Sequence, residues 1–268
     1  INECDGGIKR TEEGICVENF TCLTLFLSGE TEYEGYGKPL NGQEEPIIRY
    51  LRERGHRAKL KSWEENFQAH LREHQRLYLR TVLELEGGEE EEQRPTDERL
   101  EMVRSGKEDP GLSALLFHYG RYLILASSRP LDDLVQPATL QGIWCEDVRS
   151  VWSSNWTVNI NTQMNYWICG PGNLPECEIP LIRMVKELSD AGREAAANLN
   201  CRGFVVHHNV DLWRQCIPAL GEVKWAYWPM GGLWLTTHLY RHYLYTGDKE
   251  YLEKIYPVFQ ECTAFILD

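Results

Sequence analysis

The sequence has few basic residues for its acidic content. It contains 28 Lys and Arg against 41 Asp and Glu, which gives a formal net charge of −13. Because phosphate backbones are bound mainly through Lys and Arg, this balance argues against nucleic acid as a partner. No uninterrupted apolar run approaches the ~20 residues that a bilayer-spanning helix needs. The sequence therefore also predicts no membrane partner.

Patterns typical of metal sites and disulfide frameworks are missing as well. The nine cysteines are odd in number, include no C-x-x-C pair and lack the spacing of zinc sites. The side chains of the adjacent His207 and His208 diverge, and no third ligand follows at a standard offset. We therefore expect no metal and no cofactor. Free, buried thiols favour a reducing compartment and so a cytoplasmic protein, while secretion stays open.

Methionine is missing at the first position, and the stretch 248–268 keeps a helical periodicity to its last residue. Both features indicate a piece of a longer protein. A length of 268 residues with 42% hydrophobic residues is enough for one large domain or two modest ones.

The first part of the chain is predicted to contain two regions. β-Favouring and apolar residues at 20–27, followed by a Gly-rich polar stretch, indicate the end of an N-terminal β domain over 1–42. Charged residues with apolar ones at helical spacing indicate a helical linker over 43–108, with two helices between 45 and 85. Thr96 is a candidate N-cap for a further short helix that ends near Gly106.

From residue 109 onward the pattern favours helices separated by irregular loops. Asp109-Pro110 is a helix start, and the apolar residues up to Ala126 predict that this helix is buried. Apolar stripes predict more helices over 176–199, 233–245 and 252–267. No alternation of strands and helices is visible, so the fold class is mainly α, with a site built from loops.

The segment Thr157–Asn161 carries the most informative pattern, because polar and β-branched residues alternate strictly along it. In an extended chain Thr157, Asn159 and Asn161 share one face, which would aim both amides into a cavity. Two neutral amides can hold a water but cannot take its proton. The alternative is an Asn-rich turn that precedes a helix, since Asn is a favoured turn residue.

Five segments together resemble glycoside hydrolase family 95. They are Y-G-R-Y-L-I-L-A-S-S-R-P (119–130), L-Q-G-I-W (140–144), T-V-N-I-N-T-Q-M-N-Y-W (157–167), H-H-N-V-D-L-W (207–213) and W-P-M-G-G-L-W (228–234). Their order and spacing also fit. The resemblance implies that residues 109–268 are the first part of an (α/α)6 barrel, preceded by linker helices and the tail of an N-terminal β-sandwich domain.

The resemblance further implies an α-L-fucosidase that removes terminal fucose, often α-1,2-linked, from fucosylated oligosaccharides with inversion. The asparagines that hold the water would be Asn159 and Asn161, polarised by a distant Asp. The general acid and its partner are expected beyond Asp268, because no matching motif precedes it, so residues 1–268 alone should be inactive. Thr157 stands where some members have His, which alters one sugar contact.

Several further residues are candidates for substrate contacts. Gln163 adds a polar group to an aromatic-rich stretch of the kind that a sugar pocket needs. The resemblance favours a substrate-lining role for the loop with His207, His208 and Asp211, although a structural His held by Asp211 fits the pattern too. Trp228 is a candidate for stacking on a sugar, because the following Pro and two Gly favour an irregular loop. Other tryptophans nearby are expected in the core.

Two other functions compete with a fucosidase. A helical-barrel glycosidase could act on another sugar such as galactose, since specificity can depend on a few contacts. A carbohydrate-binding protein without catalysis would explain why no acid and base pair can be identified. The carboxylates available for such a pair are Glu146, Asp147, Glu176, Glu178, Asp211 and Glu222.

Overall fold

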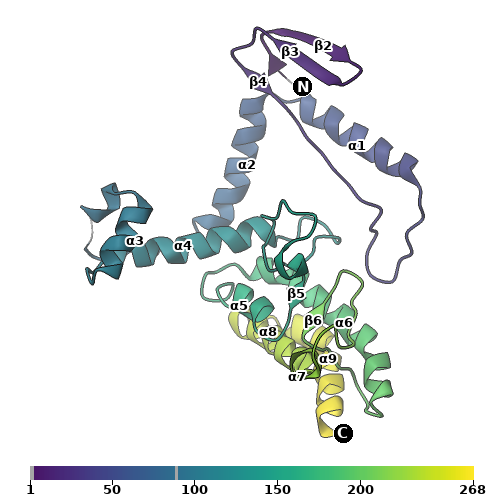
Figure 1. The fold of residues 1–268 in the computed structure, drawn as a ribbon. Helices are drawn as coiled ribbons and strands as arrows, with labels where there is room; N and C mark the ends of the chain where they lie inside the picture. The colour runs from purple at the N-terminus through teal and green to yellow at the C-terminus, as the bar shows by residue number, and fades with distance from the viewer. Residues whose placement is uncertain (1–2, 88–89) are drawn as a thin grey trace. The chain divides into compact units, whose positions relative to one another are not determined.

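The computed structural model describes residues 3–87 and 90–268, which form two compact units that meet between Arg76 and Leu77. Most of the regular structure is helical, which confirms the mainly α prediction (Figure 1). Among the described residues, no helix combines the length and the apolar character that a membrane crossing requires.

The first unit contains short strands and two helices. Strand β1 (Glu3–Cys4) pairs with β4 (Leu23–Thr24), and β2 (Gly7–Thr11) forms an antiparallel hairpin with β3 (Gly14–Glu18). Helices α1 (Glu44–Lys59) and α2 (Trp63–Tyr78) follow, and α2 runs into the second unit. The two helices expected between 45 and 85 are therefore confirmed, and their role as a linker stays a prediction. The strand expected over 20–27 is limited to Leu23–Thr24, and membership of a β-sandwich stays a prediction.

The second unit begins at Leu77 and is built mainly from helices. They are α3 (Thr96–Arg104), α4 (Pro110–Ser127), α5 (Asn161–Tyr166), α6 (Ile179–Asn198), α7 (Val223–Ala226), α8 (Gly231–Thr246) and α9 (Lys249–Leu267). Short 3-10 turns η1 (Glu91–Gln93), η2 (Val151–Ser154) and η3 (Pro175–Glu178) and the strand pair β5 (Trp156–Thr157) and β6 (Asn209–Val210) complete it. The helices predicted over 176–199, 233–245 and 252–267 are thus confirmed.

Helix α4 begins where the sequence indicates. Asp109 is its N-cap and accepts a hydrogen bond from the backbone N–H of Leu112 at 2.8 Å, and Pro110 occupies the first turn. The same carboxylate receives two hydrogen bonds from Arg99 of α3, both at 2.8 Å. Helix α3 itself starts at Thr96 with Pro95 at its N-cap, so Thr96 is not the cap residue.

The prediction that the helix from Pro110 is buried throughout is wrong. Ile124 and Leu125 near its end are buried, but Leu116 is 71% exposed and Tyr119 is 54% exposed. The N-terminal half of α4 contacts η1, Arg99 of α3 and the backbone of Leu83, and several of its apolar side chains are left exposed.

Helices α6, α8 and α9 pack against one another and form the main core (Figure 1). The apolar stripe of α6 supplies its buried side chains, as the sequence predicts. Its central members are Leu181, Met184, Val185 and Leu188. Beside this core, η3 is joined to α8 by a buried pair in which Glu178 Oε2 and His242 Nδ1 are 2.7 Å apart.

Arg121 of α4 is fully buried and bonds to backbone carbonyls. Its guanidinium donates to the carbonyl oxygens of Leu77, Tyr78, Thr81 and Gly172 at 2.6–3.2 Å. It also lies over the Tyr78 ring at 5.3 Å. One side chain therefore ties the end of α2 and the loop before η3 to α4.

Eight described cysteines are free thiols. Cys169, Cys177, Cys216 and Cys262 are buried, whereas the others are at least partly accessible. Burial raises the pKa of the Cys177 and Cys216 thiols to about 12. These two thiols are therefore held in their neutral, unreactive form.

Candidate active site

The strand pair β5 and β6 brings together two of the segments singled out in the sequence. Trp156 lies opposite Val210 and Thr157 opposite Asn209, and the backbone N–H of Val158 donates to the carbonyl of His208 at 2.7 Å. Val158 is fully buried. The T-V-N-I-N and H-H-N-V-D segments are therefore neighbours, as a shared site requires.

The chain turns directly after β5. Residues 158–160 form a turn and α5 starts at Asn161, so the extended conformation is correct only for Thr157 and the turn interpretation describes the rest. The turn leaves Asn159 half-buried, with its side-chain oxygen Oδ1 buried and without a hydrogen-bond partner among the described residues. Asn161 is exposed at the first position of α5. Whether the two amides share one water stays a prediction.

Gln163 supports this turn from inside the protein. It is fully buried, and its Nε2 donates a short hydrogen bond to the carbonyl of Val158, while its Oε1 has no partner in the described part of the chain. The side chain thus links the first turn of α5 to the start of the 158–160 turn. This contact differs from the sugar contact that the sequence suggested, which stays a prediction.

Thr157 is turned toward its own chain. Its hydroxyl donates to Oδ1 of Asn155 at 2.8 Å, and the residue is half-buried. At the position where some family members have His, this chain therefore has a hydroxyl that is already hydrogen-bonded.

His207 is buried and acts as a hydrogen-bond acceptor. The backbone N–H of Trp228 donates to its Nδ1 at 3.1 Å, and its ring lies 4.9 Å from that of Tyr227. Burial, and then the neighbouring His208, lower the pKa of His207 below its ordinary value. An accepting Nδ1 requires the neutral ring, so the geometry and the direction of the pKa shift agree.

His208 and Asp211 also form contacts other than those the sequence suggested. Nδ1 of His208 lies 3.2 Å from the carbonyl oxygen of Ala226, and Oδ1 of Asp211 accepts from the backbone N–H groups of Trp213 and Gln215, both at 2.9 Å. The hydrogen bonds of both histidines therefore go to the backbone around α7. Asp211 organises its own loop.

The W-P-M-G-G-L-W segment packs closely against this loop. A Cβ on Gly231 would lie 2.7 Å from the carbonyl oxygen of Val206 and 2.9 Å from Cγ2 of Val158. A Cβ on Gly232 would lie 2.8 Å from the Phe204 ring. The start of α8 therefore needs both glycines in order to approach the site segments.

The tryptophans of this region lie closer to the surface than expected. Trp213 and Trp225 are 50% and 40% exposed, and Trp228 and Trp234 are half-buried with ring centres 6.2 Å apart. The expectation that several of them belong to the core is wrong, because none of these four side chains is buried. Trp228 is accessible in part, and its sugar stacking stays a prediction.

Several candidate carboxylates have other partners. Glu176 pairs with Arg80 at 2.8 Å, Glu222 pairs with Lys224 at 2.7 Å, and Glu178 is buried against His242. Glu146 and Asp147 are exposed. Among the described residues, no group of three His, Cys, Asp or Glu side chains is arranged to hold a metal ion.

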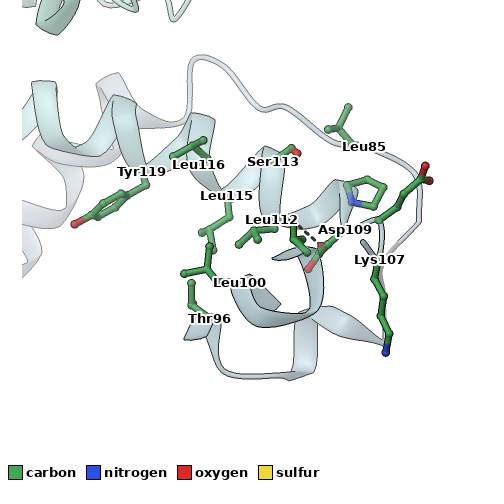
Figure 2. Close-up of a pocket in the computed structure, with 13 residues that line it drawn as sticks. Leu85, Thr96, Leu100, Lys107, Asp109, Leu112, Ser113, Leu115, Leu116 and Tyr119 are labelled. Carbon is green, nitrogen blue, oxygen red and sulfur yellow. Dashed lines mark hydrogen bonds between the residues drawn. The ribbon is translucent and has the colours of Figure 1, made fainter. Parts of the chain in front are cut away.

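Two cavities differ in chemistry. The larger one is a groove of about 980 Å³ between α3 and α4 (Figure 2). Its wall is mostly apolar and includes five leucines, and the Asp109 carboxylate within it is already bonded to Arg99 and Leu112. A groove with so few free polar groups does not suit a sugar.

The smaller cavity, about 420 Å³, adjoins the β5–β6 pair, and six of the eleven residues that line it are polar. Ser153, Ser154 and Asn155 contribute one side, and Asn209, Asp211 and Gln215 contribute the other. Asn209, which the sequence analysis did not single out, has a buried Oδ1 without a partner among the described residues. In the sequence, only its position inside the H-H-N-V-D segment could have indicated that Asn209 belongs to the site.

Comparison with known proteins identifies the family of this chain. The chain matches the model of the Glycosyl hydrolase family 95 catalytic domain over residues 62–268. That match covers most of the chain and includes all the site segments described above. The chain therefore belongs to glycoside hydrolase family 95.

Two similar proteins cover nearly the whole chain. Alpha-L-fucosidase 2 of Arabidopsis thaliana is 40% identical over 261 residues, which are 95% of this chain and 30% of that protein. Probable alpha-fucosidase A of Aspergillus niger is 32% identical over 253 residues, which are 91% and 31% of the two proteins. The chain thus spans less than a third of the length of these relatives.

Proposed function

We propose that these residues serve an inverting glycosidase that releases terminal α-L-fucose, α-1,2-linked to galactose, and that Asn159 and Asn161 hold the attacking water. One observation carries the proposal. The turn between β5 and α5, in a family 95 domain, presents a buried Asn159 oxygen that lacks a hydrogen-bond partner among the described residues. A buried polar atom without a partner is costly unless a ligand or water satisfies it. The names of the relatives support fucose as the sugar.

In this proposal the two amides position the water and a carboxylate elsewhere removes its proton, because an amide cannot act as a base at ordinary pH. Inversion requires a second carboxylic acid on the opposite face of the sugar, with the two carboxyl groups roughly 6.5–9.5 Å apart. Glu178 is 4% exposed and bonded to His242, so it does not suit either role. We place the acid and the base outside these 268 residues, in the remainder of an (α/α)6 barrel.

In this proposal the other site residues either surround the sugar or hold the backbone of the site in place. Gln163 acts through the turn that carries Asn159, while His208, Asp211 and Trp228 contribute to the wall around the sugar. His207 holds the backbone at Trp228 in place. No step calls for a metal or a cofactor.

Galactose is the second candidate sugar. Thr157 stands where some family members have His, and its hydroxyl is bonded to Asn155, so one contact to the sugar differs. The test is to incubate the intact protein with aryl α-L-fucoside, aryl galactosides and 2′-fucosyllactose and to measure the released sugar. Fucose release from both fucosides supports the proposal. Preferential release of galactose would show that galactose, and not fucose, is the sugar removed. No sugar release from any of the three kinds of substrate would refute the glycosidase assignment.

A further inference from the structure

The cavity of about 420 Å³ beside β5 and β6 has unused hydrogen-bonding capacity. The amide of Asn209 has an unpartnered buried oxygen, Oδ2 of Asp211 has no hydrogen bond, and the side chains of Ser153 and Gln215 have none within the described part of the protein. These groups include both donors and acceptors. A sugar hydroxyl also donates and accepts, so this lining suits a neutral polyhydroxylated ligand.

Charge narrows the choice of ligand. The cavity has one carboxylate, Asp211, and the nearby guanidinium of Arg214 is already bonded to Glu187 and Gln136. None of the described residues that line the cavity is a Lys or Arg, so the lining offers no cation for a phosphate or a carboxylate. A volume of about 420 Å³ lies within the range of roughly 300–1,000 Å³ for small-ligand sites.

An exposed tryptophan in an unfavourable backbone conformation lies directly before this wall. Trp152 is 80% exposed and has φ 55° and ψ 26°, and Ser153 and Ser154 follow with φ 59° and 44°. Left-handed conformations are disfavoured for residues other than glycine, above all for bulky ones. No ring or hydrogen-bond partner of the Trp152 side chain occurs among the described residues.

The surrounding structure fixes this conformation from both sides. Gln141 Nε2 donates to the carbonyl of Val151 at 2.8 Å, and the hydroxyls of Ser154 and Thr139 are 2.9 Å apart. The backbone N–H of Leu140 also donates to the carbonyl of Asn155 at 3.2 Å. The strained segment is thus held on its L-Q-G-I-W neighbour, and strain that is enforced in this way is characteristic of functional sites.

We propose that this cavity, together with Trp152 directly before its lining residue Ser153, binds the neutral sugar that carries the fucosyl group, and that this sugar leaves on hydrolysis. The proposal rests on the proposed function. Asn155 and Asn159 are four residues apart in the chain, so at most about 14 Å separates them, within the span of a short oligosaccharide. The apolar face of the sugar stacks on the indole, and its hydroxyls bond to Asn209 and Asp211.

The test compares two substrates that share fucose but differ in the leaving group. 2′-Fucosyllactose leaves a galactose-terminated disaccharide, whereas α-L-fucosyl fluoride leaves a single atom that cannot reach the cavity. In the intact protein, Trp152→Ala and Asn209→Ala should each lower the ratio of kcat/KM for the oligosaccharide to kcat/KM for the fluoride by about tenfold, mostly through KM. Trp152→Phe should keep most of that ratio. Trp63→Ala, an exposed tryptophan in the other unit, is the matched control.

Equal loss on both substrates, or no change in the ratio, would overturn the proposal. If the unsubstituted protein hydrolyses neither substrate, the proposed function fails, and lactose binding measured by titration calorimetry decides the cavity separately. Binding that Trp152→Ala removes supports a sugar site, and absence of binding refutes it. Thermal melting provides an independent check, because Trp152→Gly should be more stable than Trp152→Ala if the left-handed conformation is strained.

Discussion

The backbone N–H of Trp228 donates to Nδ1 of His207, and this hydrogen bond helps to join the W-P-M-G-G-L-W loop to the H-H-N-V-D segment. The contact exists only while His207 is neutral, because protonation turns Nδ1 into a donor.

Acidification should therefore loosen this loop. Burial lowers the pKa of His207 below its ordinary value of 6.5, so the unfolded chain takes up the proton first. The stabilisation is complete above pH 6.5 and is lost as pH falls through the lowered pKa. His207→Asn, whose Oδ1 can accept at any pH, should reduce the fall in melting temperature between pH 7.5 and 5. The control His56→Asn, at an exposed position, should not. Equal acid sensitivity of all three proteins would contradict the prediction.

Removal of the second amide of the turn should slow turnover. Asn161→Ala in the intact protein is expected to lower kcat on a fucoside by ~10² or more, as loss of a positioned catalytic contact commonly does. The fold should be unaffected, because Asn161 is exposed. Asn198→Ala, an exposed asparagine at the end of α6, is the control. Near-normal kcat for Asn161→Ala would remove this residue from the mechanism.

Gln163→Leu should separate positioning from stability. The change leaves the carbonyl of Val158 without its donor, which costs about 1–3 kcal/mol, but it also removes the unpartnered buried Oε1, which returns a similar amount. Net stability should change by about 1 kcal/mol or less, while kcat falls because the turn with Asn159 is no longer held. Calorimetry and initial rates on the same samples test this. A large loss of stability with normal kcat would assign Gln163 a purely structural role.

The pair of Asp109 and Arg99 should make the start of α4 sensitive to acid. Hydrogen bonds from Arg99 lower the pKa of Asp109 below its ordinary value of 3.8, so its stabilisation is present above that pH and is lost as pH falls through the lowered pKa. Asp109→Asn should lower the melting temperature at pH 7, and the difference from the unsubstituted protein should shrink at acid pH. Asp97→Asn, exposed on α3, is the control. A constant difference at all pH values would show that charge is not involved.

Residues 1–268 produced alone should not release fucose. Three of the candidate carboxylates, Glu176, Glu222 and Glu178, are paired with Arg80, Lys224 and His242. The open face of α4 should promote association of the isolated piece. The measurement is fucose release beside the intact protein, with light scattering as a readout of association. Turnover near that of the intact protein would mean that the acid is present after all, and Glu146 would be the first carboxylate to test.

The sequence predicts the start of a helix well where neighbouring residues alone determine it. Asp109-Pro110 marks the start of α4 because capping and proline geometry act within one turn. Burial of the same helix is wrongly predicted, because it depends on which other segments cover it. The hairpin of β2 and β3 escaped notice because it contains few apolar residues and none of its side chains is buried.

In the candidate site, too, the sequence predicts what depends on local residues and misses what depends on contacts between distant segments. The motif containing Asn159 and Asn161 is visible in the sequence, but alternation suggests a strand where Gln163 and the carbonyl of His208 fix a turn. That choice depends on contacts between segments 50 residues apart. The left-handed conformation of Trp152 has no local signal either, since only bonds to Gln141 and Thr139 reveal why it is held.

Arg121 has a consequence for how this family can vary. Its hydrogen bonds to Leu77, Tyr78, Thr81 and Gly172 all go to main-chain carbonyls, so no substitution of a partner side chain can restore these hydrogen bonds once Arg121 is lost. Thr81 can be replaced without loss of its hydrogen bond to Arg121, because every amino acid has the same backbone carbonyl. In a saturation mutagenesis library, Arg121 should therefore stand out as intolerant without any second-site suppressor, and even lysine should fail because it lacks the planar fork that reaches several acceptors at once.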